Sequence, residues 1–175
     1  ERLSQLSKTL LEMSSLQSAA RTDRIQLGPM IEEIFTDLAP LAERVGVTLE
    51  REGDAAMTGS DTLIYRLLFN LTENAIKYNR RGGSVLVSVS AGQPELEIRV
   101  SDTGHGIPES CRSSVFHPFF RVDQSRSRER GGVGLGLSLV WEIAALHGGG
   151  VWVEQSSGAG TTILARLPVR QPEGS

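Results

Sequence analysis

Between residues 84 and 102 the sequence reads SVLVSVSAGQPELEIRVSD, and this segment narrows the choice of fold more than any other. Apolar residues recur at every second position on both sides of the turn residues Gly92, Gln93 and Pro94. A period of two predicts two strands of a hairpin, each with one face on a core. GVWVEQS and TTILARLP predict a second hairpin near the end of the chain. The sheet they form needs a cover for its apolar face.

Three segments have the apolar spacing of amphipathic helices and could supply that cover. The first opens at Gly28 with a proline, which is tolerated in a first turn, and stops at Gly46. The second follows a cap at Ser60 or Asp61, and the third is LGLSLVWEIAALHGG. A strand, VTLERE, lies between the first two helices. These elements predict an α+β fold, a two-layer sandwich with helices on one face of a mixed, largely antiparallel sheet.

The composition suits one domain and argues against several classes of function. With 175 residues and 39% hydrophobic content, the chain can build one core. Its net charge of -3 offers no basic field for nucleic acid, and one cysteine rules out a disulfide framework. No apolar run reaches the roughly 20 residues that span a bilayer. We therefore expect neither a nucleic-acid partner nor direct membrane contact by these residues.

The two ends of the chain differ from its middle. Apolar residues between Leu3 and Leu16 form a narrow stripe of the coiled-coil kind, which predicts packing against another helix. The last residues, RQPEGS, predict a flexible tail. Because the chain begins without a methionine, we expect it to be part of a longer protein.

The second predicted helix carries an unusual row of polar residues. Asparagine is a poor helix former, yet Asn70 and Asn74 lie one turn apart, with Lys77 one turn further on. At 100° per residue the three fall along one edge of the apolar face, where a cleft could lie. An amide oxygen suits Mg²⁺ and adds no negative charge. Surface residues that happen to align would give the same pattern, so both readings stay open for this helix alone.

The end of the strand ELEIRVSD places a carboxylate at the core. Side chains alternate along a strand, so Asp102 shares the inward face with Leu96, Ile98 and Val100. We expect this carboxylate to lack a protein partner and to need a donor, such as the exocyclic amine of adenine. Gly104 would let the following backbone approach a ligand closely. An ordinary Asp-Thr-Gly turn is the alternative.

Glycines lead directly into the third helix, in GGVGLGLSL. A helix start of this kind offers free N–H groups to phosphate. The segment is not a Walker A loop, since no Gly-Lys-Ser/Thr follows. A dinucleotide fingerprint, with Glu154 as the ribose-binding acid, would need a strand before the glycines, whereas the polar QSRSRERGG precedes them. The three histidines show no metal-ligand spacing.

Taken in order, these elements resemble the ATP-binding catalytic domain of sensor histidine kinases, in the wider superfamily of gyrase, heat-shock chaperone, histidine kinase and mismatch-repair ATPases. NLTENAIKYN resembles the N box, DTGHGI the first glycine box, FHPFFRVD the F box and GGVGLGLSL the second glycine box. TLLEMSSLQ resembles the end of the second dimerisation helix. The resemblance implies the Bergerat fold and three parts: that helix end at 1–21, the ATP-binding domain at 22–170 and a flexible tail at 171–175.

The resemblance also implies roles for particular residues. Asn74 would bind Mg²⁺, and Asn74, Lys77 and Arg121 would be the catalytic set. Asp102 would read the adenine amine, aided by Thr161 on the inward face of the last strand. The other residues expected to contact ATP are Asn70, Tyr78, Gly104, Gly106, Ile107, Phe120, Gly132, Gly134, Leu135, Gly136 and Leu137. Residues 122–131 would form a lid over the triphosphate.

By resemblance, the function is transfer of the γ-phosphoryl group of ATP to a histidine on a dimerisation domain, for relay to a response regulator. The implied partners are that dimerisation domain, within a homodimer, and the cognate response regulator. The parent protein would be anchored in the bacterial inner membrane, with this domain in the cytoplasm. The acceptor histidine is missing, because no histidine precedes His105. Val133 also replaces a threonine that is common in the second glycine box.

Related activities remain as alternatives. An ATP-driven clamp of the same superfamily carries a glutamate base one turn before the metal-binding asparagine, and here Asn70 holds that position. A serine kinase of the anti-sigma type fits less well, because the dimerisation-helix remnant, the F box and the Lys77-Tyr78 pair favour a histidine kinase. A domain that only binds nucleotide is the third alternative, and the complete set of motifs argues against it.

Overall fold

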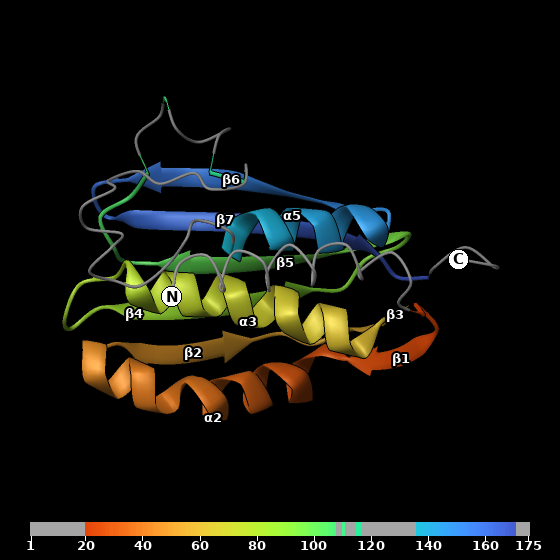
Figure 1. Ribbon diagram of the computed structural model, residues 1–175, viewed down its shortest axis with the longest axis horizontal. Helices are drawn as coiled ribbons and strands as arrows, with labels where there is room; N and C mark the ends of the chain where they lie inside the picture. Colours follow the sequence, from red (N-terminus) through yellow and green to blue (C-terminus); the bar gives the residue numbers. More distant parts are fainter. Residues whose placement is uncertain (1–19, 108–109, 111–114, 117–135, 171–175) are drawn as a thin grey trace, which may run out of the picture.

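The computed structural model describes residues 20–107, 110, 115–116 and 136–170 (Figure 1). The predicted helix from Leu3 to Leu16, the predicted lid at 122–131 and the predicted tail at 171–175 lie outside these residues.

A five-stranded sheet forms one layer of the fold. It contains β2 (Thr48–Glu52), β4 (Ser84–Ser90), β5 (Glu95–Asp102), β6 (Gly150–Ser157) and β7 (Gly160–Pro168). Their order across the sheet is β2-β4-β5-β7-β6, in which β2 and β4 are parallel and all other neighbours are antiparallel. Both predicted hairpins and the predicted strand before them are therefore confirmed.

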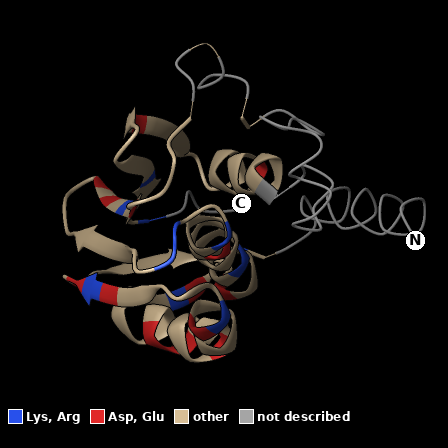
Figure 2. Ribbon diagram, turned by 90° about the vertical axis from the view of Figure 1, so that its left-hand side faces the viewer, with Lys and Arg blue, Asp and Glu red and all other residues tan. Residues whose placement is uncertain are grey.

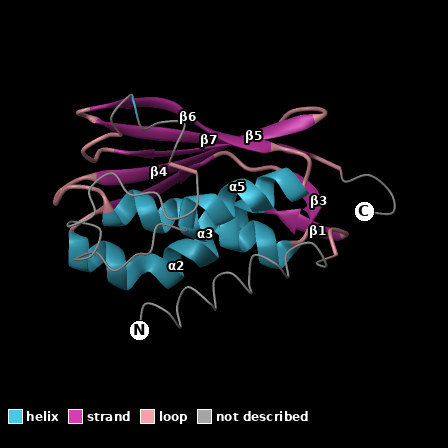
Figure 3. Cartoon of the chain, turned by 45° about the horizontal axis from the view of Figure 1, so that its top comes forward, coloured by secondary structure: helices cyan, strands magenta, loops and turns pink. Residues whose placement is uncertain are grey.

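Three helices cover one face of this sheet: α2 (Leu27–Val45), α3 (Asp61–Lys77) and α5 (Gly136–Leu146) (Figure 3). α2 ends at Gly46, whose φ of 85° is left-handed, as expected for the predicted stop. Of the two candidate caps of α3, the structure selects Ser60, whose hydroxyl accepts from the Leu63 N–H at 3.3 Å. The predicted two-layer α+β architecture is confirmed.

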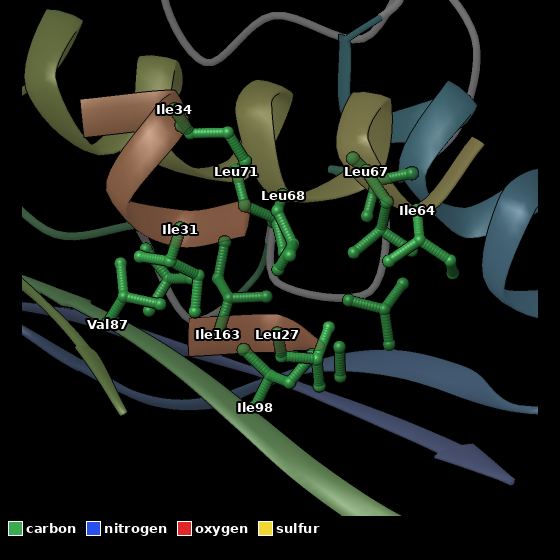
Figure 4. Packing of buried hydrophobic residues seen from close by; sticks show 14 of the residues in the cluster. Leu27, Ile31, Ile34, Ile64, Leu67, Leu68, Leu71, Val87, Ile98 and Ile163 are labelled. Atoms are coloured by element: carbon green, nitrogen blue, oxygen red, sulfur yellow. The ribbon is translucent and has the colours of Figure 1, made fainter. Parts of the chain in front are cut away.

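The core lies between the helices and the sheet (Figure 4). α2 and α3 each direct a row of aliphatic side chains toward the inward faces of the strands, as their helical spacing predicts. The largest fully buried side chains are Leu27, Ile31, Ile34, Met57, Ile64, Leu67, Leu68, Leu71, Ile76, Leu96, Ile98 and Ile143. Because this core fixes α3 against β5, it also sets where the ends of these two elements meet.

The outer face of the sheet carries a group of ion pairs. Glu97 on β5 lies 2.8 Å from the Arg166 guanidinium and 3.2 Å from that of Arg99. Arg99 in turn lies 2.7 Å from Glu154 on β6. The hydrogen bond from Arg166 is the main cause that lowers the pKa of Glu97. Among the described elements, acidic and basic residues are interspersed on the ribbon (Figure 2), a pattern typical of a solvated antiparallel face.

A small second sheet was not predicted. β1 (Asp23–Gln26) pairs antiparallel with β3 (Ala56–Gly59), and both have four residues, too few to show a clear period. Between β2 and β3, Asp54 holds the start of α2: its Oδ1 accepts from the N–H groups of Gly28 at 2.7 Å and Ala55 at 2.8 Å. The bond from Gly28 is the main cause that lowers the pKa of Asp54. Asp54 thus caps a helix whose own N-cap residue, Gln26, makes no side-chain cap.

His147, just after α5, links α5 to α3. Its ring is fully buried, and Nδ1 lies 2.8 Å from the Ile143 carbonyl oxygen. The Ser60 N–H donates to Nε2 at 3.1 Å, so the proton of the neutral ring belongs on Nδ1. Burial is the main cause that lowers the pKa of His147. The end of α5 and the start of α3 are therefore joined through a neutral imidazole.

Candidate nucleotide-binding site

The C-terminal half of α3 presents the predicted row of polar residues. Asn70, Asn74 and Lys77 are all partly exposed, whereas Leu71 and Ala75 between them are buried. The row therefore lies at the rim of the buried face, as its helical spacing predicts. The Lys77 ammonium lies 3.7 Å from the Glu73 carboxylate, a contact that was not among the predictions. Side chains four residues apart on a helix are neighbours, so this pair is a local contact.

Asp102 ends β5 on the core side. Leu96, Ile98 and Val100, which share its face, are buried, so the expected alternation is confirmed. The expectation that the carboxylate lacks a protein partner is wrong: Oδ1 accepts from the N–H groups of Gly104 at 2.8 Å and Thr161 at 3.2 Å. The antiparallel register supplies the second donor, because it pairs Asp102 with a residue 59 positions away.

The two oxygens of Asp102 have different surroundings. Both protein hydrogen bonds reach Oδ1, and no described residue donates to Oδ2. Burial outweighs the bonds from Gly104 and Thr161 and raises the pKa of Asp102 above its ordinary value. Oδ2 is therefore the atom of this carboxyl group that can accept a hydrogen bond from a ligand.

Thr161 contributes to the site through its backbone and its hydroxyl. It is buried at the start of β7, on the inward face as predicted. Its N–H holds Asp102, and its Oγ1 lies 2.8 Å from the hydroxyl of Ser156. The Ser156 hydroxyl also accepts from the Ile107 N–H at 2.7 Å. Ser156 thus ties β6 to the glycine loop, defined here as residues 103–107, and no sequence pattern predicts this contact.

Gly104 and Gly106 allow the glycine loop to approach neighbouring backbone. A Cβ on Gly104 would overlap the carbonyl oxygen of Tyr78, and one on Gly106 would overlap that of Ser157. Gly106 also has a left-handed φ of 81°. The close approach that the structure shows is made to the chain itself, at the end of α3 and the end of β6, and the predicted approach to a ligand stays a prediction.

Asn79 and Arg80, which follow Lys77 and Tyr78, hold the end of α3 against the sheet. Asn79 is buried, and its Nδ2 donates to the Ser84 carbonyl oxygen at 2.9 Å. Its Oδ1 accepts from the Thr103 hydroxyl at 3.0 Å and from the Arg80 N–H at 2.8 Å. Asn79 stood inside the N-box motif without an assigned role. Its burial could not be foreseen, because it depends on Ser84 and Thr103, which the fold brings back to the end of α3.

Arg80 joins three segments that are far apart in the sequence. Its Nη2 donates to the carbonyl oxygens of Gly104 at 2.9 Å and Gly158 at 2.8 Å. Tyr78, expected to lie against adenine, is 41% exposed at the end of α3. The structure therefore brings Tyr78, Asp102, Gly104 and Thr161 together around one end of the sheet.

The remaining predicted residues divide between described and undescribed parts. Gly136 and Leu137 form the first turn of α5, and Leu137 packs against the core. Phe120, Arg121, Gly132, Gly134 and Leu135 lie outside the described residues. Within the described ranges, no group of three His, Cys, Asp or Glu side chains could hold a metal ion. No helix of the described part is long and apolar enough to cross a membrane.

This chain belongs to the histidine kinase-, DNA gyrase B-, and HSP90-like ATPase family, which matches residues 59–171. Sensor histidine kinase RppB of Synechocystis sp. is 32% identical over 174 residues, covering 96% of this chain and 38% of RppB. The chain therefore spans less than half the length of this relative. The predicted family resemblance is confirmed, and the family is one of ATPases.

Solved structures agree with the fold. The mycobacterial sensor histidine kinase MprB is 27% identical, with a TM-score of 0.72, and the match covers 86% of this chain and 99% of that one. Histidine kinase ThkA in complex with response regulator protein TrrA is 24% identical, with a TM-score of 0.76, covering 99% of this chain and 49% of that one. The second likeness concerns the fold alone.

Proposed function

We propose that residues 22–170 are the catalytic ATP-binding domain of a sensor histidine kinase, which transfers the γ-phosphoryl group of ATP to a histidine on a dimerisation domain. The observation that carries this proposal is Asp102. Its Oδ1 is held by two backbone donors, and its Oδ2 is left to accept from a ligand. The exocyclic amine of adenine is a donor that suits this oxygen, whereas guanine presents a carbonyl oxygen at the same position.

The α3 row supports a triphosphate site beside the base. Asn74, at the rim of the core, would offer an amide oxygen to Mg²⁺, with Asn70 supporting the ion or the phosphates. Because no carboxylate cluster is present among the described residues, the ion would take its other ligands from water and phosphate oxygens. When bound, Mg²⁺ neutralises charge on the phosphates.

Cationic side chains would complete the phosphate site. Lys77, now 3.7 Å from Glu73, would turn to a phosphate, since a triphosphate offers more negative charge than one carboxylate. Arg121 and the glycines at 132, 134 and 136 would contact the triphosphate, with Phe120, Leu135 and Leu137 beside them. The start of α5 at Gly136 supports this placement, because helix N–H groups bind phosphate.

The proposed partners lie in the parent protein and beyond it. Residues 1–21 would be the end of the second dimerisation helix, which pairs in a homodimer and carries the domain near the acceptor histidine. The cognate response regulator would then receive the phosphoryl group. We also propose that the parent is anchored in the bacterial inner membrane and holds this domain in the cytoplasm. The sensor histidine kinase names of the relatives support these partners.

The decisive experiment mixes this chain with ATP, Mg²⁺ and the histidine-bearing dimerisation domain of its parent. An acid-labile phosphoryl group should form on that domain, and none on this chain alone. A related clamp ATPase would instead release phosphate without labelling the dimerisation domain. Phosphate release with no phosphohistidine would overturn the kinase proposal. The appearance of phosphohistidine at His105, His117 or His147 would contradict the need for an external acceptor.

A further inference from the structure

We infer that Arg80 is a positioning residue that fixes the glycine loop beneath Asp102 and thereby sets the selectivity of the base pocket. The inference rests on the proposed function, because it takes the pocket at Asp102 to hold a nucleobase. It starts from a geometric fact: one nitrogen of Arg80, Nη2, donates to two carbonyl oxygens, those of Gly104 and Gly158. This nitrogen carries two hydrogens, so both bonds can exist at once.

The backbone of Arg80 is also held by a hydrogen bond. Its N–H donates to Asn79 Oδ1, and Asn79 is itself bonded to Ser84 and Thr103. Gly83 makes this network possible, because a Cβ there would overlap Asn79 Oδ1 and Thr103 Oγ1. Arg80 therefore reaches the glycine loop from a fixed point at the end of α3.

These hydrogen bonds connect Arg80, the glycine loop, Asp102 and the β6–β7 turn around the proposed base pocket. Arg80 holds the carbonyl of Gly104, while the N–H of Gly104 holds Asp102 Oδ1. The same Oδ1 accepts from Thr161 on β7, and the turn between β6 and β7 leads back to Gly158 and Arg80. Without the guanidinium, the glycine loop and the β6–β7 turn keep their bonds through Asp102 and Ser156 but lose the two bonds by which Arg80 holds Gly104 and Gly158 together. The direction of Asp102 Oδ2 would then be less well defined.

The neighbouring arginine provides a matched control. Arg81 has the same charge and follows directly, but its side chain lies beside Gly46 at the end of α2. Replacing either residue by alanine removes one positive charge from the same part of the surface. A difference between the two variants therefore reports the bonds of Arg80 and not its charge.

The test compares wild type, Arg80→Ala, Arg80→Lys and Arg81→Ala in two measurements. The first is amide exchange without nucleotide. Arg80→Ala should speed exchange at Gly104 and Ile107, whose N–H groups bond within the pocket, and should leave Val100 in the core unchanged. The second is calorimetric affinity for ATP and for GTP. Arg80→Ala should lower the ratio of ATP to GTP affinity by about fivefold or more, the factor for one ordinary hydrogen bond.

The two control variants sharpen the outcome. Arg81→Ala should match wild type in both measurements. Arg80→Lys should restore each effect only in part, because its ammonium can also donate to two carbonyl oxygens but ends a shorter and more flexible side chain. A merely structural role would not change a ratio of affinities. If Arg80→Ala exchanged at the rates of Arg81→Ala, the inference would fail. Amide exchange is measured without nucleotide, so it tests the role of Arg80 independently of the proposed function. If the proposed function were wrong, wild type itself would bind no ATP.

Discussion

Asp102 uses its two carboxylate oxygens differently, and this makes a precise substitution possible. Asp102→Asn can keep Oδ1 for the N–H groups of Gly104 and Thr161 while replacing Oδ2 with an amide nitrogen. That nitrogen is a donor and would face the donor amine of adenine. We expect ATP affinity to fall about 10- to 150-fold, the cost of a lost hydrogen bond to a charged group. Isothermal titration calorimetry with ATP measures this change.

Two comparisons make this prediction specific to the base. Wild type should prefer ATP over GTP by at least a similar factor, because guanine would set two acceptors against each other. Asn74→Asp should weaken binding of the metal and triphosphate and leave the preference for adenine in place. Wild-type affinity in Asp102→Asn would show that adenine binds elsewhere and would remove the main support for the assignment.

The same carboxylate is expected to lower the stability of the fold. Burial raises the pKa of Asp102, so at neutral pH the ionised form costs the folded state free energy that the unfolded chain does not bear. Since the folded pKa is the higher one, this cost disappears as the pH falls through it. Asp102→Asn should therefore unfold at the same urea concentration as wild type or at a higher one. A marked loss of stability would mean that the charge supports the fold.

At the scale of elements, Asp54 is expected to stabilise the start of α2 from outside the helix. Asp54→Ala removes the acceptor for the Gly28 N–H and should cost about 1 kcal/mol, as for other lost caps. Because the folded pKa of Asp54 is lowered, its contribution is present above the unfolded pKa and is lost as the pH falls through the folded value. Urea unfolding between acidic and neutral pH measures both effects. Glu43→Ala, on the exposed side of α2, should show neither.

The His147 link between α5 and α3 predicts a second pH dependence. Protonation would place a hydrogen on Nε2, which now accepts from the Ser60 N–H. Since the folded pKa lies below the ordinary value, stability should fall as the pH drops below about 6.5, where the unfolded chain takes up the proton first. His147→Phe should lose this dependence and about 1–3 kcal/mol, because Ser60 keeps a buried donor. His105→Gln should retain the wild-type profile.

The elements that were predictable are those with a period of their own. Buried and more exposed residues alternate along the seven residues of β4 and the eight of β5, and α3 carries a cap and an apolar stripe. The sequences of these elements alone were therefore sufficient to predict them. β1 and β3 have four residues each and depend on pairing with one another. The capping role of Asp54 was likewise not predictable, because Asp54 lies 26 positions from Gly28, whose N–H donates to it.

For the whole molecule, stability is expected to come from the layer between helices and sheet. Ile98 and Arg99 are neighbours on β5 and point to opposite faces. Ile98→Ala should cost about 2–5 kcal/mol, because its side chain is fully buried. Arg99→Ala removes two partly exposed ion pairs, with Glu97 and Glu154, and should cost no more than about 1 kcal/mol. Chemical denaturation of the two variants measures both losses in unfolding free energy. A larger loss for Arg99→Ala than for Ile98→Ala would contradict this prediction.

In the candidate site, placement was predictable where it depends on the residue pattern and hidden where it depends on backbone contacts. The inward direction of Asp102 and Thr161 followed from strand alternation, and the rim position of Asn74 followed from helical spacing. The contacts of Arg80 are made to carbonyl oxygens 24 and 78 positions away, and every residue has a carbonyl, so no sequence pattern marks them. Ser156 was missed for a similar reason, since its partner is the N–H of Ile107.

The close packing of glycines around the proposed base pocket has a consequence for inhibitors. Gly104 lies against the Tyr78 carbonyl, Gly106 against that of Ser157, and Gly160 against that of Asp102, so main chain packs on main chain at all three positions. Main-chain atoms persist when side chains are exchanged, and any larger residue at these three glycines would collide with them. At the proposed nucleotide site, an inhibitor shaped to these segments would therefore meet a surface that substitutions at the three glycines cannot change without disturbing the packing of the chain.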